Sequence, residues 1–437
     1  VPILANSGTE AMAALGYSAD FSNFTLCQTM YATSNLFQVS PVVYINVLDP
    51  AKHNKELAEA EYQVNQKQSV IEQEGIILDG LTVKNSTGET ELKAGEDYSA
   101  AFDSTTGFLT ITMLAGGKGA SATAIKVSGK VIDPSKIKKE DIIGAVDPST
   151  GAETGAQVIR QVYPRLGIVP GLILAPGWSQ IPEVGLALAA KAAKVNGVFS
   201  AMALLDLDTT KAKKYTDTKS VKEESGYTSP YCYPLWPCDR VGEYILAKSA
   251  TVGAMIQYMA SDNEDVPNQS PSNHLLGVGG QCLADGTEVY LDQDQANTVN
   301  SYGVTTAINQ NGYRLWGNYT GAYPASSDAK DIWFAVRRMF SWQGNNFIQT
   351  YFDEVDEPMN NVLVQSVVDG ENIRCSAYAP KYWAGASIEY KSEDNPSTAI
   401  LAGTMKFRQH IAPYTPAQEI VDIIDYDTDT LAAAVGG

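Results

Sequence analysis

Residues 171–208 read GLILAPGWSQIPEVGLALAAKAAKVNGVFSAMALLDLD, and this stretch decides the fold class. Residues 171–175 are a short apolar run that ends at Pro176-Gly177, which predicts a buried strand followed by a turn. Residues 183–196 are rich in Ala and Leu, the composition of a helix. Residues 198–205 form a third segment, again an apolar strand. A strand, a helix and a strand joined by short turns make a βαβ unit, so we expect an α/β core.

The composition is that of an acidic globular protein. The 437 residues include 31 Lys+Arg and 50 Asp+Glu, a formal net charge of −19, and 44% of them are hydrophobic. A disordered acidic chain would contain far fewer hydrophobic residues. The length suggests two to four domains of about 100–200 residues each. Because nucleic-acid binding depends on Lys and Arg that neutralise phosphates, we expect no direct nucleic-acid partner.

The sequence predicts no membrane insertion and no disulfide framework. The apolar run at 166–182 is interrupted by three prolines and is shorter than the about 20 residues that a spanning helix needs. The chain begins Val1-Pro2-Ile3-Leu4, without a basic leader or a cleavage site, so we expect no signal peptide. The cysteines are odd in number and widely scattered, which favours a reducing cytoplasm. They are Cys27, Cys232, Cys238, Cys282 and Cys375.

An inserted small all-β domain is expected at residues 76–146. Short strand patterns there are separated by turns rich in Gly, Asn, Ser and Asp, including one at 104–107. These strand patterns cover residues 81–84, 108–113 and 124–127. Residues 53–74 fit either a helix or a pair of strands. The α/β core is therefore expected to comprise residues 1–75 and 147–340.

An α+β C-terminal domain is expected at residues 341–437. Just before it, a helix is predicted at 326–342, with Asp331 near its N-terminus and Arg337-Arg338 near its C-terminus, where each charge suits the helix dipole. Strands are predicted at residues 372–378, 386–391 and 404–411. The end of the chain, 422–437, is acidic and then rich in Ala and Gly, and we expect it to be poorly ordered unless something binds it.

No motif assembles a catalytic, cofactor-binding or metal-binding site. The three histidines lack metal-ligand spacing. The Gly116-Gly-Lys-Gly119 stretch lacks the Ser or Thr and the first Gly of a phosphate loop, so we interpret it as a hairpin turn. Asp206 and Asp208 follow a strand of the α/β core, where active sites often lie, but no partner base accompanies them. A hydrolase that uses one of these two carboxylates is the enzymatic alternative.

Three other clusters are interpreted as structural. Cys232 and Cys238 are expected to be buried thiols in an aromatic turn. The acidic residues 353–357 are expected to form a solvated or interface loop rather than a calcium site. A calcium loop needs alternating oxygen ligands and a Gly at its tight turn, whereas Pro358 closes this segment. The lysine-rich residues 211–222 are expected to form an exposed loop, or alternatively a contact for an acidic neighbouring subunit.

Short segments that are spread over nearly the whole chain resemble those of one protein family, and they occur in the same order. They are SPVVYINVLDPAKH at 40–53, LILAPG at 172–177, SPYCYPLW at 229–236, SPSN at 270–273, GVTT at 303–306, residues 325–338 with Asp331 and Arg337-Arg338, and MKFR at 405–408 followed by Pro413 and Pro416. The chain resembles the contractile tail sheath proteins of bacteriophages and phage-tail-like bacteriocins.

The resemblance implies an α/β core with a variable, outward-facing β insertion and a C-terminal domain nearer the tail axis. It implies stacked six-membered rings wound around an inner tail tube, with neighbours linked by exchanged N- and C-terminal strands. Contraction would use stored conformational energy to drive the tube through the target cell envelope, without a cofactor. The implied partners are other sheath subunits, the tail tube protein, and baseplate and tail terminator proteins. The implied location is a phage tail or tail-like particle, made in the bacterial host cytoplasm.

The resemblance also directs attention to two sets of residues. Basic side chains of the C-terminal region are candidates for facing the tube: Lys406, Arg408, Arg337 and Arg338. Apolar residues near the C-terminus are candidates for an inter-subunit linking arm: Ile420, Val421, Ile423, Ile424 and Tyr426. Because such a strand has no partner in its own sequence neighbourhood, we expect it to add to a sheet edge of another subunit. The family's N-terminal extension is expected to lie upstream of Val1. An extracellular β-rich adhesin is a third reading, which the cysteine usage disfavours.

Overall fold

The βαβ unit is the centre of the molecule. In the computed structural model, which describes residues 1–103 and 106–436, a parallel sheet of three strands has the order β10-β11-β12. The strands are β10 (Leu172–Leu174), β11 (Met202–Asp206) and β12 (Cys232–Leu235), and α5 (Pro182–Ala193) connects the first two. Every residue of β11 is buried, which explains its continuous apolar sequence. The prediction of an α/β core is confirmed by this sheet.

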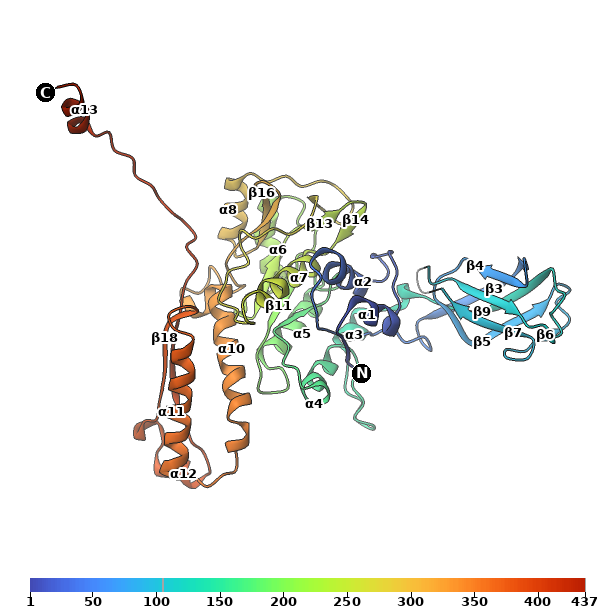
Figure 1. Cartoon of the computed structure of the whole chain (residues 1–437), viewed down its shortest axis with the longest axis horizontal. Helices are drawn as coiled ribbons and strands as arrows, with labels where there is room; N and C mark the ends of the chain where they lie inside the picture. Colours follow the sequence, from blue (N-terminus) through green and yellow to red (C-terminus); the bar gives the residue numbers. More distant parts are fainter. Residues whose placement is uncertain (104–105, 437) are drawn as a thin grey trace.

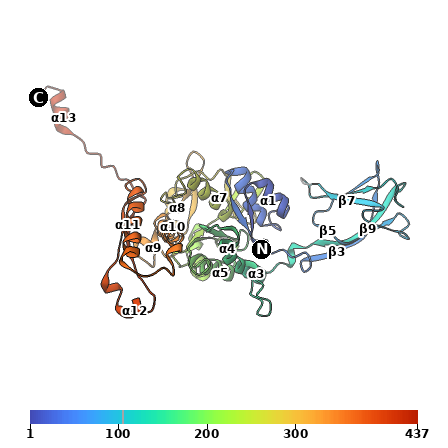
Figure 2. The ribbon, with the colours of Figure 1, turned by 60° about the horizontal axis from the view of Figure 1, so that its bottom comes forward.

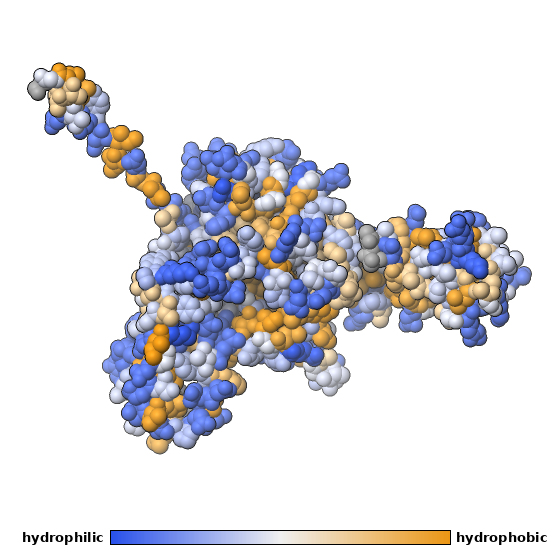
Figure 3. Space-filling model, in the orientation of Figure 1, coloured by the Kyte–Doolittle hydropathy of each residue, from blue (hydrophilic) through white to orange (hydrophobic). Residues whose placement is uncertain are grey.

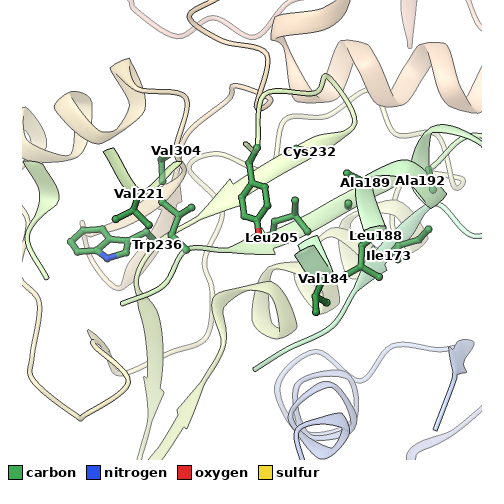
Figure 4. Close-up of a cluster of buried hydrophobic side chains, with 14 of the residues drawn as sticks. Ile173, Val184, Leu188, Ala189, Ala192, Leu205, Val221, Cys232, Trp236 and Val304 are labelled. Atoms are coloured by element: carbon green, nitrogen blue, oxygen red, sulfur yellow. The ribbon is translucent and has the colours of Figure 1, made fainter. Parts of the chain in front are cut away.

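Helices cover both faces of the parallel sheet (Figure 1). One core cluster joins α5 to Ile173, Leu205 and Trp236, as Figure 4 shows. The other joins Leu204 and Tyr233 to α7 (Lys248–Ser261) and the rest of that face. The close packing of α5 requires a glycine, because a Cβ at Gly185 would lie 2.1 Å from Oη of Tyr227.

Further short elements complete the core. The N-terminal layer contains β1 (Ile3–Ala5), α1 (Gly8–Leu15), α2 (Leu26–Tyr31), a π-helix (Ala32–Leu36) and β2 (Val42–Tyr44). The later elements are α3 (Lys139–Ile143), a 3-10 helix (Gly155–Gln161), α4 (Val162–Leu166), α6 (Thr218–Ser225), β13 (Cys238–Val241), β14 (Tyr244–Leu246), β15 (Gly280–Cys282), α8 (Gln293–Ser301), β16 (Thr306–Asn309) and β17 (Tyr313–Trp316). The expected loop at 211–222 is in part the helix α6, where Lys222 is buried.

The inserted domain consists of two antiparallel sheets that enclose their own core and project from one side of the molecule (Figures 1 and 2). One sheet contains β3 (Asn54–Gln63), β9 (Ala124–Ile132), β5 (Ile76–Asn85) and β6 (Glu91–Leu92). The other contains β4 (Gln68–Ile71), β8 (Leu109–Met113) and β7 (Tyr98–Phe102). The turn expected at 104–107 lies partly outside the described residues.

The range of this insertion differs from the expected 76–146. Its strands run from Asn54 to Ile132, so residues 53–74 are largely two strands, β3 and β4, which pair with β9 and β8 in different sheets. The helix α3 packs against α5 of the core instead. The sequence of β3 obscured the true start. It is an edge strand whose exposed Lys and Glu side chains replace the usual alternation of apolar and polar residues.

The C-terminal region is a pair of long helices with a two-stranded sheet. It contains α9 (Ala329–Ile332), α10 (Phe334–Thr350), α11 (Asn361–Ala377), β18 (Trp383–Glu389), α12 (Ser397–Leu401), β19 (Arg408–Pro413) and α13 (Thr428–Ala434). The predicted strand at 372–378 is wrong, since these residues mostly belong to α11. The predicted helix end at 342 is also wrong, because α10 continues to Thr350 across the expected boundary at 341. Across the described ranges, no helix has the combined length and apolar character of a membrane span.

Candidate assembly site

Of the two carboxylates that an enzyme would use, Asp206 is closed off inside the core and Asp208 is partly exposed in a turn. Asp206, at the end of β11, is 7% exposed and accepts hydrogen bonds from Ser249 N (2.8 Å) and Ser179 Oγ (2.9 Å), with Ser249 Oγ as a third donor. Burial raises the pKa of Asp206, although these hydrogen bonds oppose the shift. Asp208 accepts from Thr210 N at 2.9 Å in a local turn. Both carboxylates therefore stabilise the fold.

A second polar group beside Asp206 is equally enclosed. Lys248, in the first turn of α7, forms an ion pair with Asp239 of β13, and both side chains are fully buried. Thr251 donates to the same carboxylate. Within the described ranges, no group of three His, Cys, Asp or Glu side chains is placed to hold a metal ion. We conclude that these side chains hold α7 against the sheets.

The four basic candidates occupy different environments. Lys406 is exposed, and its backbone N–H donates to Asn395 Oδ1 at 2.7 Å. Arg408 is exposed but forms two hydrogen bonds with Asp394, at 2.6 and 3.0 Å. Lys406 thus leaves its ammonium group without a carboxylate partner in the part of the chain that the structure describes, whereas Arg408 already has one.

Arg337 and Arg338 lie in the first turns of α10, so the expected interaction with a helix C-terminus is wrong. Arg337 donates to Asp331 Oδ1 at 3.2 Å, and its guanidinium lies 4.4 Å from the centre of the Tyr231 ring. Arg338 lies over the Phe334 ring at 5.7 Å. Burial lowers the pKa of Arg338 to about 10. Arg337 is held by Asp331 and Tyr231, and Arg338 is partly buried beside Phe334, so neither is a fully exposed surface cation.

The apolar residues near the C-terminus are all exposed. Beyond β19 the chain extends away from the body as a segment without regular structure and ends in α13 (Figure 1). We call residues 414–436 the arm. Its apolar residues are exposed by 70–88%: Ile420, Val421, Ile423, Ile424 and Tyr426. Figure 3 shows this run as an apolar stretch outside the folded body. Such a run is a contact surface without a partner.

The base of the arm is attached to the body by two tyrosines. Tyr414 Oη donates to the backbone oxygen of Pro380 at 3.0 Å. Tyr319 Oη donates to Gln418 Oε1 at 2.7 Å, and the Tyr319 ring stacks on Tyr323. Two residues beyond Gln418, the apolar run begins without a contact to the body. The arm therefore leaves the body in a fixed position.

The sheet formed by β18 and β19 has one edge that is covered and one that is open. Asn372 of α11 donates to the backbone oxygen of Ile388 (3.0 Å) and accepts from its N–H (2.9 Å). The backbone groups of Ile388 therefore face away from β19, and Asn372 occupies the outer edge of β18 there. Gln409 is opposite Ile388 and Ile411 is two residues further along β19.

This register identifies the open edge. Residues that face each other in an antiparallel ladder share the same hydrogen-bonding role. Since the backbone groups of Ile388 face away from β19, those of Gln409 and Ile411 face away from β18. We call these groups the β19 outer edge. In the described chain, β19 pairs only with β18, so the β19 outer edge is available to another strand.

A buried carboxylate holds β19 in place. Glu371 of α11 is fully buried and accepts from Gln409 Nε2 (2.7 Å), Arg374 Nη2 (2.6 Å) and Gln343 Nε2 (2.5 Å). The group thus joins α10, α11 and β19. Sequence reasoning missed it. The signal was a Glu in the buried stripe Leu363, Val367, Glu371 and Cys375.

Comparisons with known proteins show similarity to tail sheath proteins. No protein-family model matches the chain. The tail sheath protein of Burkholderia phage BcepMu is 25% identical over 96% of this chain and 88% of that protein. The tail sheath protein of Escherichia phage P2 is 24% identical over 64% of this chain and 69% of that protein. The chain is a homologue of contractile tail sheath proteins.

Solved structures agree with this fold. The sheath of an extracellular contractile injection system (PVC) in the contracted state matches with a TM-score of 0.50 and 17% identity, over 63% of this sheath protein and 76% of that chain. The helical sheath of the anti-feeding prophage in the contracted state matches with a TM-score of 0.50 and 18% identity, over 69% and 78%. The resemblance deduced from the sequence segments is confirmed, and the hydrolase alternative has no support.

Proposed function

We propose that this sheath protein polymerises as stacked six-membered rings around a tail tube, and that contraction drives the tube through a target cell envelope. The partners would be further sheath subunits, the tube, and baseplate and terminator proteins of a phage tail or tail-like particle. No catalysis, nucleic acid or membrane insertion is part of this proposal. The observation that carries it is the arm, whose apolar run has no contact with its own subunit.

The arm of one subunit would add to the β19 outer edge of the next. An added strand would pair its backbone with Gln409 and Ile411 and bury its aliphatic side chains. Each Ile or Val that is buried contributes about 1.5–3 kcal/mol, which must exceed the cost of ordering the segment. Because donor and acceptor are different surfaces, the link is heterologous and propagates from subunit to subunit.

The two ends of the molecule support a radial arrangement. The β insertion and the α10–α11 helix pair project in different directions from the core (Figure 2). We propose that the insertion faces outward and that the C-terminal region approaches the tube. Lys406 is the preferred tube contact because it is exposed and forms no ion pair with any residue that the structure describes, and Arg408 is second because Asp394 already neutralises it. Arg337 and Arg338 are not retained for this role.

The energy for contraction would be conformational. Gly116-Gly-Lys-Gly119 lies in a turn of the insertion, where Lys118 N donates to Asp97 Oδ1 at 2.7 Å, and not between a strand and a helix. The hairpin interpretation is wrong, because this turn leads from β8 in one sheet to β9 in the other, and the strand β9 follows it where a phosphate loop has a helix. A subunit assembled in one state and more stable in another needs no hydrolysis to contract.

Truncation tests the proposal. A chain that ends at Thr415 should fold as a soluble monomer, since it loses no buried side chain, and should form no rings or tubes in negative-stain micrographs. The matched control is Val435→Ser, which removes an exposed apolar residue outside the apolar run. Normal sheaths from the truncated chain would refute the linking role of the arm.

A further inference from the structure

Arg338 is a cation without a partner at the junction of the core and the C-terminal region. Its guanidinium lies over the Phe334 ring, and no hydrogen-bond acceptor or carboxylate of the described chain contacts it. Burial lowers its pKa, and Tyr233 is the ionisable group that acts against this shift. The side chain is partly exposed, so its five donors can be reached by an anion from outside the subunit.

The side chain borders a small pocket. The cavity has a volume of only about 10 Å³ and opens to solvent between α7 and the loop that follows it. Apart from Arg338, it is lined mainly by apolar and neutral side chains, among them Ile256, Met259, Asn263 and Val266. Glu264 of the same loop does not serve Arg338, since it pairs with Lys381 at 2.9 Å. Arg338 is the charged residue of this lining, so a carboxylate could pair with its guanidinium at the open side of the cavity.

The pocket lies close to the β19 outer edge. Val266 belongs to the same apolar cluster as Met339 and Trp383, and Ile411 packs against that cluster. Gln409 and Gln343 both donate to Glu371, which places that part of the edge level with the middle of α10. Arg338 is five residues before Gln343, which is about 7.5 Å along the helix. A strand added to the edge would therefore pass near the pocket.

The arm is negatively charged and so complements the positive charge of Arg338 in the pocket. Residues 414–436 contain five acidic residues and no Lys or Arg. The acids are Glu419, Asp422, Asp425, Asp427 and Asp429. They alternate with the apolar run, so burying the aliphatic side chains would place carboxylates beside them.

We propose that the Arg338 pocket binds a carboxylate side chain from the arm of a second copy of this chain. This inference rests on the proposed linking function and adds a site that determines which segment the edge accepts. Charge-assisted hydrogen bonds to a guanidinium are directional and strong, so the site would fix the register of the added strand.

The test measures binding of a fluorescein-labelled peptide of residues 414–437 to the full chain by fluorescence anisotropy. Arg338→Gln should weaken binding about tenfold or more. A peptide with its five acids changed to Asn or Gln should lose as much, and combining both changes should cost nothing further. The matched control is Arg165→Gln, which removes an exposed arginine on the surface of the α/β core domain. Arg338→Lys keeps the charge without the planar fork and should bind with intermediate affinity.

The outcomes separate this site from the linking function. Equal affinity for the native chain and the Arg338→Gln variant would overturn the pocket, and loss of binding in Ile411→Pro would still support the linking edge. A loss in Arg338→Gln with no change in Ile411→Pro would support the pocket and overturn the edge. Absence of peptide binding to the native chain would overturn both. Because Arg338 has no hydrogen-bond or carboxylate partner among the described residues, its replacement should change the thermal midpoint of the free subunit little.

Discussion

Gln409 of β19 donates its side-chain amide to the buried carboxylate of Glu371 on α11 at 2.7 Å. The strand proposed to receive a neighbour is therefore attached to the helix pair by a polar contact as well as by its ladder with β18. The same carboxylate binds Arg374 and Gln343, so one group positions three elements. An assembly edge held in this way presents its backbone groups in a defined place, which reduces the cost of adding a strand.

Glu371→Ala should therefore destabilise the C-terminal region. Removing the carboxylate leaves Arg374 and two amides without their acceptor, and breaking a buried pair costs about 3–5 kcal/mol. Urea unfolding followed by circular dichroism measures the loss, and the exposed Glu419→Gln is the control. A change below about 1 kcal/mol would show that the group does not hold β19 in place.

Acid should weaken the same contact. Burial acts to raise the pKa of Glu371, but the hydrogen bonds and charge of Arg374, with Gln343 and Gln409, outweigh it and lower the pKa. The carboxylate therefore contributes stability above its unfolded pKa of about 4.3, and this contribution is lost as the pH falls through the lower folded-state value. Comparing native protein with Glu371→Gln between pH 3 and pH 6 should show a pH dependence that the variant lacks. Parallel curves would contradict the account.

Lys222 should also make stability rise with pH, but in the alkaline range. Its ammonium group is buried and donates to the backbone oxygens of Tyr302 (2.8 Å) and Tyr323 (2.5 Å), without a carboxylate. Burial lowers its pKa to about 8. The unfolded chain then binds more protons than the folded one, so this residue makes stability rise between about pH 8 and pH 10.4. Lys222→Met should lack this rise, and identical pH profiles would contradict it.

The β insertion should be removable at the boundaries that the structure defines. Asp133 N donates to the backbone oxygen of His53 at 2.8 Å, so the chain enters and leaves the insertion at adjacent positions. Replacing residues 54–132 by a short Gly/Ser linker should leave the core folded, because closing a short loop between neighbouring points costs little. Deleting 76–146 instead removes α3 and leaves β3 without β9, and this control should aggregate. Unfolding of the 54–132 deletion, judged by near-UV circular dichroism, would contradict the independence of the domain.

The elements that could be predicted from the sequence are those whose pattern of apolar and polar residues follows directly from their burial. The strands β10 and β11 are continuous apolar runs because both of their faces are covered. The edge strand β3 could not be recognised, since its charged residues serve to protect an edge that the sequence does not show. The end of α11 was mistaken for a strand because its buried stripe includes the polar Glu371, whose partners lie on α10 and β19.

At the assembly site, the arm could be predicted from the sequence but the edge that would accept it could not. Its apolar residues could be selected from the sequence, because an isolated apolar run close to acidic residues has no place in a core. The acceptor could not be selected, since the open state of the β19 outer edge depends on Asn372 covering the other edge of the sheet. The helix α13 was also missed. It begins after Asp427, whose carboxylate accepts from Thr430 N at 2.9 Å.

The most direct test of the central claim mixes two variants in sedimentation velocity. One chain ends at Thr415 and keeps the β19 outer edge, and the other carries Ile411→Pro and keeps the arm. Proline removes the outward N–H of Ile411 without removing a bond to β18. Each variant alone should sediment as a folded monomer, and the mixture should form 1:1 dimers that do not grow. Polymers from either variant alone, or no dimer in the mixture, would contradict a link made by the arm and this edge.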